Sequence, residues 1–123
     1  MAVSRFCIRR TASGYKFDLL AANGQVILTS EVYTSRAAAR KGAASVRLIA
    51  PGAPLENRTE EPVQIQPNPK FELYQDKAGQ FRFRLKARNG KIVGVSEGYS
   101  NRSGCLNGIE SVRNNALEAQ IEE

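Results

Sequence analysis

The chain has 123 residues, enough for one domain that folds around its own core without a disulfide framework or a structural metal. Histidine is absent, only two cysteines occur, and neither a phosphate-loop nor a dinucleotide-binding motif is present, so the usual zinc sites and nucleotide cradles are excluded and we expect neither an enzyme nor a cofactor. The net charge is +6 and no apolar run approaches the ~20 residues that span a bilayer, so we expect a cytoplasmic protein with no membrane partner.

The cysteines, Cys7 and Cys105, lie in opposite halves of the chain. A small secreted protein usually has more cysteines at regular spacing, so we predict two free, buried thiols. A bridge between the two, or a reactive thiol, stays open as the alternative.

The chain repeats itself with an offset of 66 residues. The segment Gln25-Val26-Ile27 corresponds to Lys91-Ile92-Val93, Ser30-Glu31-Val32-Tyr33 to Ser96-Glu97-Gly98-Tyr99, and Ser45-Val46-Arg47 to Ser111-Val112-Arg113. All five prolines fall between residues 51 and 69, where they prevent a helix or a central strand. We predict one domain, 1–123, with a first repeat at about 3–50, an extended linker at 51–69 and a second repeat at about 70–116. Residues 63–65 could form a short edge strand within the linker.

Each repeat is predicted to contain three strands followed by a helix. Apolar and polar residues alternate over 15–21 and 81–87, which is typical of a strand with one buried face. The preceding strands are expected at 5–9 and 70–75, and the following ones at 26–29 and 92–95. The Asn-Gly dipeptide after each central strand favours a two-residue type I′ hairpin.

The predicted helices cover about 35–49 and 101–115, with Thr34 and Ser100 as candidate N-caps. Gly42 and Gly108 fall on the apolar side of these helices, although glycine costs about 1 kcal/mol against alanine in a helix interior. We infer that this side approaches the sheet too closely for a β-carbon. The predicted fold class is α+β, with one antiparallel six-stranded sheet and two helices on its apolar face.

The repeat also resembles a known family. Asn-Gly, an apolar strand, Ser-Glu-x-Tyr and a helix with Asn-Gly-Ile-Glu-Ser-Val at 107–112 are similar to the YegP-like family, whereas the first repeat has Lys-Gly-Ala-Ala-Ser-Val at 41–46. The resemblance implies tandem β-β-β-α repeats in one sheet, with helices exchanged between the repeats. It implies no established activity. We expect a monomer with an internal pseudo-two-fold axis.

Basic residues are one candidate for function. Residues 1–50 hold eight basic and two acidic residues, and a second cluster points outward from the strand 81–87. Weak, sequence-tolerant nucleic-acid binding would use these side chains. The candidate contacts are Arg36, Arg40, Lys41, Arg47, Arg82, Arg84, Lys86 and Arg88. On the outward face we also expect Glu72 beside Arg84 and Tyr74 beside Arg82, which are ordinary cross-strand pairs.

Apolar residues on the same outward face are the other candidate. With two-residue hairpins, Leu20 and Ile27 point outward in the first repeat, and Val93 and Val95 do so in the second. Exposed apolar area of this kind often marks a contact surface. The Ser-Glu-x-Tyr segments could form a polar site, but Tyr33 and Tyr99 are better interpreted as fixing the helix entry to the sheet. The favoured hypothesis is a non-enzymatic module that binds an unknown protein through the outward sheet face.

Overall fold

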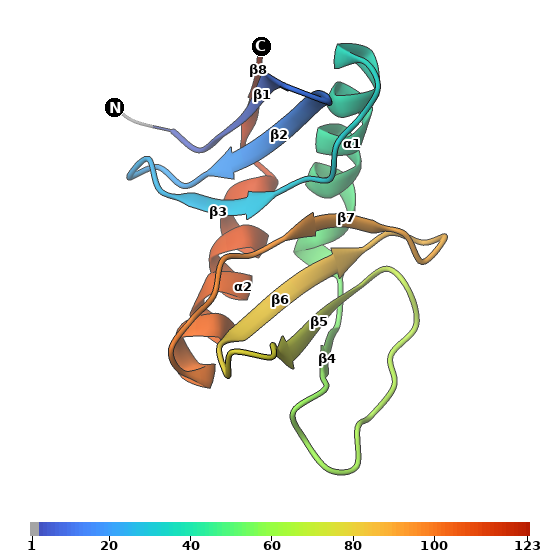
Figure 1. Cartoon of the computed structure of the whole chain (residues 1–123), viewed down its shortest axis with the longest axis vertical. Helices are drawn as coiled ribbons and strands as arrows, with labels where there is room; N and C mark the ends of the chain where they lie inside the picture. The colour runs from blue at the N-terminus through green and yellow to red at the C-terminus, as the bar shows by residue number, and fades with distance from the viewer. Residues whose placement is uncertain (1–2) are drawn as a thin grey trace.

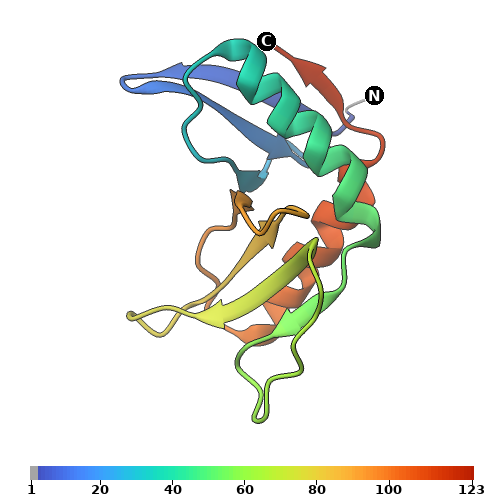
Figure 2. The ribbon, with the colours of Figure 1, turned by 90° about the vertical axis from the view of Figure 1, so that its right-hand side faces the viewer.

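The computed structural model describes residues 3–123 and places a sheet in one layer and both helices in a second layer on one face of it (Figures 1 and 2). The strands are β1 (Arg5–Thr11), β2 (Gly14–Leu20), β3 (Val26–Thr29), β4 (Leu55–Asn57), β5 (Lys70–Gln75), β6 (Phe81–Lys86), β7 (Ile92–Val95) and β8 (Gln120–Glu122). The helices are α1 (Arg36–Ile49) and α2 (Arg102–Ala116), and a short 3-10 turn (Ala50–Gly52) follows α1. In the described part of the chain, neither helix has the length and hydropathy to traverse a bilayer.

The sheet order is β4-β5-β6-β7-β3-β2-β1-β8. The two predicted repeats therefore lie side by side and meet where β3 pairs with β7. The prediction of six antiparallel strands was incomplete, because β4 and β8 add a parallel strand at each edge. The predicted linker contains β4, whereas residues 63–65 form no strand.

The halves exchange their last elements. After α1 the chain crosses to the second half, where β4 pairs with β5, and after α2 it crosses back, where β8 pairs with β1 (Figure 1). Each helix contacts strands of its own repeat and also reaches across the centre, α1 to β7 and α2 to β3. The exchange that the family resemblance implied thus consists of helices that span both halves and of short strands that lie at the far edges.

The Asn-Gly turns differ from the predicted type I′ hairpins. Ala21 N–H donates to the carbonyl of Gln25 at 2.9 Å, and Gly24 N–H donates to the carbonyl of Ala21 at 2.9 Å. Gly24 has φ +86°, but no non-glycine residue in the described chain has a positive φ, so Asn23 cannot be part of a type I′ turn. The loop is one residue longer than predicted, and a bulge follows that pairs Leu20 with Val26.

The core is built from one aromatic cluster in each half. Phe17 packs edge-on against Phe6 at 5.8 Å between ring centroids and stacks on Tyr33 at 6.2 Å. Phe83 repeats this arrangement with Phe71 at 6.0 Å and Tyr99 at 6.3 Å. The two phenylalanines of each pair come from adjacent strands, so their alternation with polar residues produces a continuous buried layer beneath the helices.

The mid-helix glycines confirm the inferred close approach. Gly42 and Gly108 are buried, and a β-carbon on Gly42 would lie 2.6 Å from Cζ of Tyr33. The helix starts are each one residue later than predicted: Ser35 Oγ accepts a hydrogen bond from Ala38 N–H at 3.0 Å, and Asn101 Oδ1 accepts one from Gly104 N–H at 2.7 Å. Ser35 and Asn101 are therefore the N-caps, in place of Thr34 and Ser100.

Both cysteines are free. Cys105 is buried on α2, and its burial raises the thiol pKa to about 11, which disfavours the reactive thiolate. Cys7 is only half-buried on β1, opposite Asp18. The prediction of free thiols is confirmed, while the predicted burial holds for Cys105 alone.

Candidate functional site

The apolar part of the outward sheet face has different members from those predicted. Ile27 and Val93 are 9% exposed and belong to the core, so their assignment to the outward face was wrong. The bulge explains this difference, because it moves Val26 into the position opposite Leu20. The equivalent bulge in the second half places Ile92 opposite Lys86.

Four apolar side chains occupy the outward face on both sides of the β3–β7 junction: Leu20, Val26, Ile92 and Val95. Two of them, Leu20 and Val95, were predicted. Val26 is 38% exposed, and the other three are half-buried. Sequence reasoning missed Val26 and Ile92 because it used a two-residue turn to set the register.

Basic side chains on the outward face of the second half are paired with acidic ones. Arg84 Nε lies 2.6 Å from Glu72 Oε1, and Lys86 Nζ lies 3.3 Å from Glu72 Oε2. Arg82 Nε lies 2.7 Å from Asp76 Oδ2. The predicted cross-strand neighbours, Glu72 with Arg84 and Tyr74 with Arg82, are confirmed by the register. Arg88 is exposed in the turn after β6.

The other basic candidates lie in the helix layer. Arg36 and Arg40 at the start of α1 form ion pairs with Glu123. Arg47 Nη2 donates to the carbonyl of Ala119 at 2.6 Å, and Lys41 is exposed. The eight candidates for nucleic-acid contact are therefore divided between α1 and the opposite face of the sheet, with no common surface.

A buried ionic cluster that sequence reasoning missed lies under the loop from β4 to β5. Glu56 is fully buried and accepts hydrogen bonds from Lys70 Nζ at 2.7 Å, Arg58 Nη1 at 2.6 Å and the backbone N–H of Gln66 at 2.8 Å. Burial alone would raise the pKa of Glu56, but these donors hold it at about 2. The cluster fixes the loop to the sheet. Sequence reasoning missed the cluster because a glutamate in a proline-rich segment resembles a solvent-exposed linker residue.

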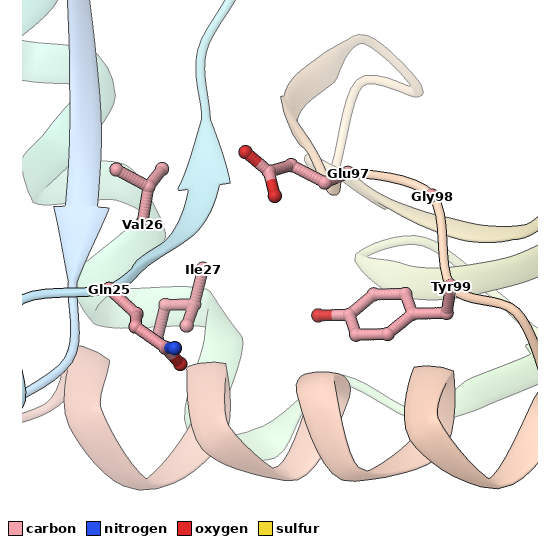
Figure 3. A pocket seen from close by; sticks show the side chains of 6 residues that line it. All are labelled: Gln25, Val26, Ile27, Glu97, Gly98 and Tyr99. Carbon is pink, nitrogen blue, oxygen red and sulfur yellow. The ribbon is translucent and has the colours of Figure 1, made fainter.

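The junction between the halves is narrow. The register between β3 and β7 contains a single residue pair, Thr29 with Val95. To one side of this pair, β3 and the segment after β7 enclose a pocket of about 310 Å³, which we call the seam pocket (Figure 3). Its lining residues are Gln25, Val26, Ile27, Glu97, Gly98 and Tyr99. Both halves of the chain thus contribute to it.

The Ser-Glu-x-Tyr segments have a structural serine. Ser96 Oγ accepts a hydrogen bond from Phe83 N–H at 2.8 Å and donates to the carbonyl of Glu97 at 2.8 Å. Ser30 does the same with Phe17 at 2.9 Å and Glu31 at 2.8 Å. The serine therefore joins the end of the third strand to the central strand in each half.

The tyrosine of each segment fixes the start of its helix, as predicted. Tyr33 exchanges two backbone hydrogen bonds with Tyr15, at 2.8 and 2.7 Å, and its ring lies between Phe17 and Gly42. Tyr99 does the same in the second half with Phe81, at 2.8 and 2.7 Å. Burial raises the pKa of Tyr99, and the nearby Cys105 and Glu97 raise it further. The glutamates, Glu31 and Glu97, are exposed and have no ion-pair partner among residues 3–123.

A family model described as "Domain of unknown function (DUF1508)" matches residues 11–57 and 76–123, one match for each half. The chain belongs to this family. The DUF1508 chain is 38% identical over 124 residues to the UPF0339 protein YegP of Yersinia pestis, covering 100% of this chain and 97% of that protein. The YegP-like resemblance is thereby confirmed.

Two further relatives resemble this DUF1508 protein in structure or in sequence. The solution structure of yegP from E. coli, a protein of unknown function, has a TM-score of 0.78 and 33% identity, covering 99% of this chain and 93% of that one. A UPF0339 protein of Treponema denticola is 57% identical over 54 residues, which is 93% of that protein but 44% of this chain. The relatives thus share the tandem fold or a single repeat, and they are uncharacterised.

Proposed function

We propose that this DUF1508 protein is a non-enzymatic protein-interaction module that binds its partner through the outward sheet face around the β3–β7 junction. The observation that supports this most directly is the group of apolar side chains there, Leu20, Val26, Ile92 and Val95. They come from both halves, and both helices of residues 3–123 pack on the opposite face of the sheet (Figure 2). Apolar side chains with a polar rim are typical of protein contact surfaces.

The ionic contacts favour a protein partner over nucleic acid. Arg84 and Lys86 share Glu72, and Arg82 is held by Asp76, so phosphate contacts would compete with existing pairs. The Tyr74 ring is covered by the guanidinium of Arg84, 4.6 Å from the ring centroid, and offers no free stacking surface for a base.

The lowered carboxylate pKa values have a structural explanation. Glu56, Glu72 and Asp76 have pKa values below their ordinary ones because each accepts hydrogen bonds from basic side chains. None of the three lines the seam pocket. These three carboxylates are thus poor candidates for a general acid or base near neutral pH, where such groups have raised pKa values.

The experiment that tests this proposal is affinity capture from the native cell with the Leu20→Asp/Val95→Asp double variant. The matched control is Leu48→Asp, because Leu48 is 82% exposed on α1 in the opposite layer. We expect the double variant to lose the partners that the wild type captures and Leu48→Asp to keep them. Amide spectra should show that both variants are folded. Retention of all partners by the double variant would contradict the proposal.

Nuclease treatment in the same capture experiment tests the alternative function, nucleic-acid binding. Partners that disappear after nuclease treatment of the wild-type capture would indicate nucleic-acid binding through the basic residues. Titration with RNA and DNA at two salt concentrations then checks that result, because phosphate contacts weaken steeply as salt rises.

A further inference from the structure

Glu97 lies in the seam pocket, whereas its counterpart Glu31 does not. The Glu97 carboxylate points across the pocket toward Val26, and the Tyr99 hydroxyl points toward Ile27 (Figure 3). The serine and tyrosine of this segment have structural hydrogen bonds, whereas the Glu97 carboxylate has no ion pair within residues 3–123. Arg82, which donates to the carbonyl of Ser96 at 3.3 Å, interacts with Glu97 only at longer range. The pKa of Arg82 is raised mainly by its hydrogen bond to Asp76, and Glu97 makes a smaller contribution. The carboxylate can therefore still accept a direct ion pair from a ligand.

The lining of the pocket matches a side chain with an aliphatic stem and a cationic head. Val26 and Ile27 contribute apolar side chains to the lining, while Glu97, Tyr99 and Gln25 contribute polar groups. A volume of about 310 Å³ is at the low end for ligand pockets, and it suits one side chain better than a cofactor. Lysine and arginine bury their stems against apolar surface and keep their charge near a polar partner.

The two halves differ at the position of Gln25, whose counterpart in the second half is Lys91. Among the described residues, 3–123, Lys91 forms no ion pair with Glu31, the counterpart of Glu97. In the seam pocket the position is held by the neutral amide of Gln25. Within residues 3–123, no lysine or arginine nitrogen lies within 4.0 Å of the Glu97 carboxylate.

The β7 side of β3 has little strand pairing. Gln25 and Val26 pair with β2 on the other side, but the register with β7 contains Thr29 and Val95 alone. An extended peptide can therefore lie along this side of β3 in the way that peptides add to an exposed strand.

We propose that the seam pocket binds a lysine or arginine side chain that a partner protein presents on an extended segment. The cation pairs with Glu97, and the stem lies against Val26 and Ile27. This inference rests on the proposed function, because it names the chemistry of the protein partner at the same junction.

The first test is a titration of the full-length, ¹⁵N-labelled chain with two capped tripeptides, acetyl-Gly-Lys-Gly-amide and acetyl-Gly-norleucine-Gly-amide. We expect the lysine peptide to shift the amide signals of residues 25–27 and 97–99 at millimolar concentrations. The norleucine peptide has the stem without the charge, and should bind about tenfold more weakly. Equal binding of the two peptides, or shifts confined to other residues, would overturn the proposal.

Matched variants then test the role of the carboxylate. Glu97→Gln should weaken the lysine peptide about tenfold, whereas Glu31→Gln should leave its affinity unchanged. Gln25→Lys places the chain's own cation in the pocket and should also weaken the peptide. Equal effects of Glu97→Gln and Glu31→Gln would show that the peptide responds only to the net charge of the protein, which contradicts binding in a specific pocket.

Partner capture with Glu97→Gln distinguishes this inference from the proposed function. If the lysine peptide fails to bind and Glu97→Gln keeps all partners that Leu20→Asp/Val95→Asp loses, the pocket inference is wrong and the interaction face stands. If the peptide binds the pocket but neither variant changes the captured partners, the proposed function fails instead. Binding of an RNA oligonucleotide at residues 25–27 and 97–99 in place of the peptide would also overturn the inference.

Discussion

The ring of Tyr99 occupies the space that a side chain on Gly108 would need. A β-carbon at position 108 would lie 2.8 Å from Cζ of Tyr99 and 3.0 Å from Cε2 of Phe83. Tyr33 and Gly42 form the same contact in the first half. The glycine in each helix is therefore matched to the tyrosine that precedes the helix, although the two are nine residues apart in each half.

This contact predicts that Gly108→Ala destabilises the protein. In a helix without such a neighbour, alanine would add about 1 kcal/mol, but here overpacking should lower the free energy of unfolding by about 1–3 kcal/mol. Urea unfolding of the variant measures the change. Gly52→Ala is the control, because a β-carbon at that position would have no neighbour within 4 Å and its stability should be unchanged or slightly higher. A more stable Gly108→Ala would refute the contact.

The ionic cluster at Glu56 predicts a loss of stability in acid. The pKa of Glu56 is about 2 in the folded protein and near 4.5 in an unfolded chain, so the folded state holds the proton more weakly. Its contribution is fully present above about pH 4.5 and disappears as the pH falls toward 2. Unfolding free energies measured across this range should decrease steeply for the wild type.

The Glu56→Gln variant checks the origin of that pH dependence. Its slope between pH 4.5 and 2 should be smaller than that of the wild type, and at neutral pH it should be less stable by about 3 kcal/mol because Lys70 loses its closest partner. Glu60→Gln is the control, since Glu60 is exposed and its carboxylate accepts one hydrogen bond, from Asn57. An identical slope in wild type and Glu56→Gln would rule out this origin.

The bulge after the Asn-Gly turn predicts unequal effects at neighbouring positions. Ile27→Ala should lower the free energy of unfolding by about 2–4 kcal/mol, because Ile27 packs in the core. Val26→Ala should cost less than about 1 kcal/mol, since Val26 is 38% exposed on the outward face. Thermal or urea unfolding of both variants measures these losses. With the register of a two-residue turn, Val26→Ala would be the more destabilising variant.

Arg47 and Arg113 each hold the segment before one exchanged strand, so we expect the loss of either arginine to destabilise only that strand. Arg47 on α1 donates to the carbonyl of Ala119 before β8, and Arg113 on α2 donates to the carbonyl of Ala53 before β4, at 2.6 and 2.7 Å. Arg47→Met should reduce amide-exchange protection in β8 about tenfold and leave β4 unchanged, while Arg113→Met should do the reverse. Each variant is the control for the other. Equal losses in both strands would show that the arginines act on global stability only.

Much of the fold could be predicted because its signals are periodic. The alternation around Phe17 and Phe83, the helical spacing around Gly42 and Gly108, and the constant offset between the halves all reflect burial on one side of an element. By contrast, β4 and β8 have three residues each, too short for any period to be detected. Their position depends on where the helix ends deliver the chain, which is a tertiary property.

The candidate site was less predictable, for two physical reasons. The outward apolar group depends on one extra residue in each turn. Because of it, Val26 rather than Ile27, and Ile92 rather than Val93, lies on the outward face. The seam pocket depends on the separation of β3 from the segment after β7, which no local pattern encodes. Glu97 did stand out in the repeated motif, but its open surroundings emerge only when the halves are placed together.

The exchange of β4 and β8 between the halves has a consequence for unfolding. Each half is completed by a strand that belongs, by sequence, to its twin. Unfolding of one half withdraws the edge strand of the other half, so we expect the two halves of this chain to unfold together. We expect a single cooperative unfolding transition in calorimetry, even though the sheet is joined at its middle by one residue pair.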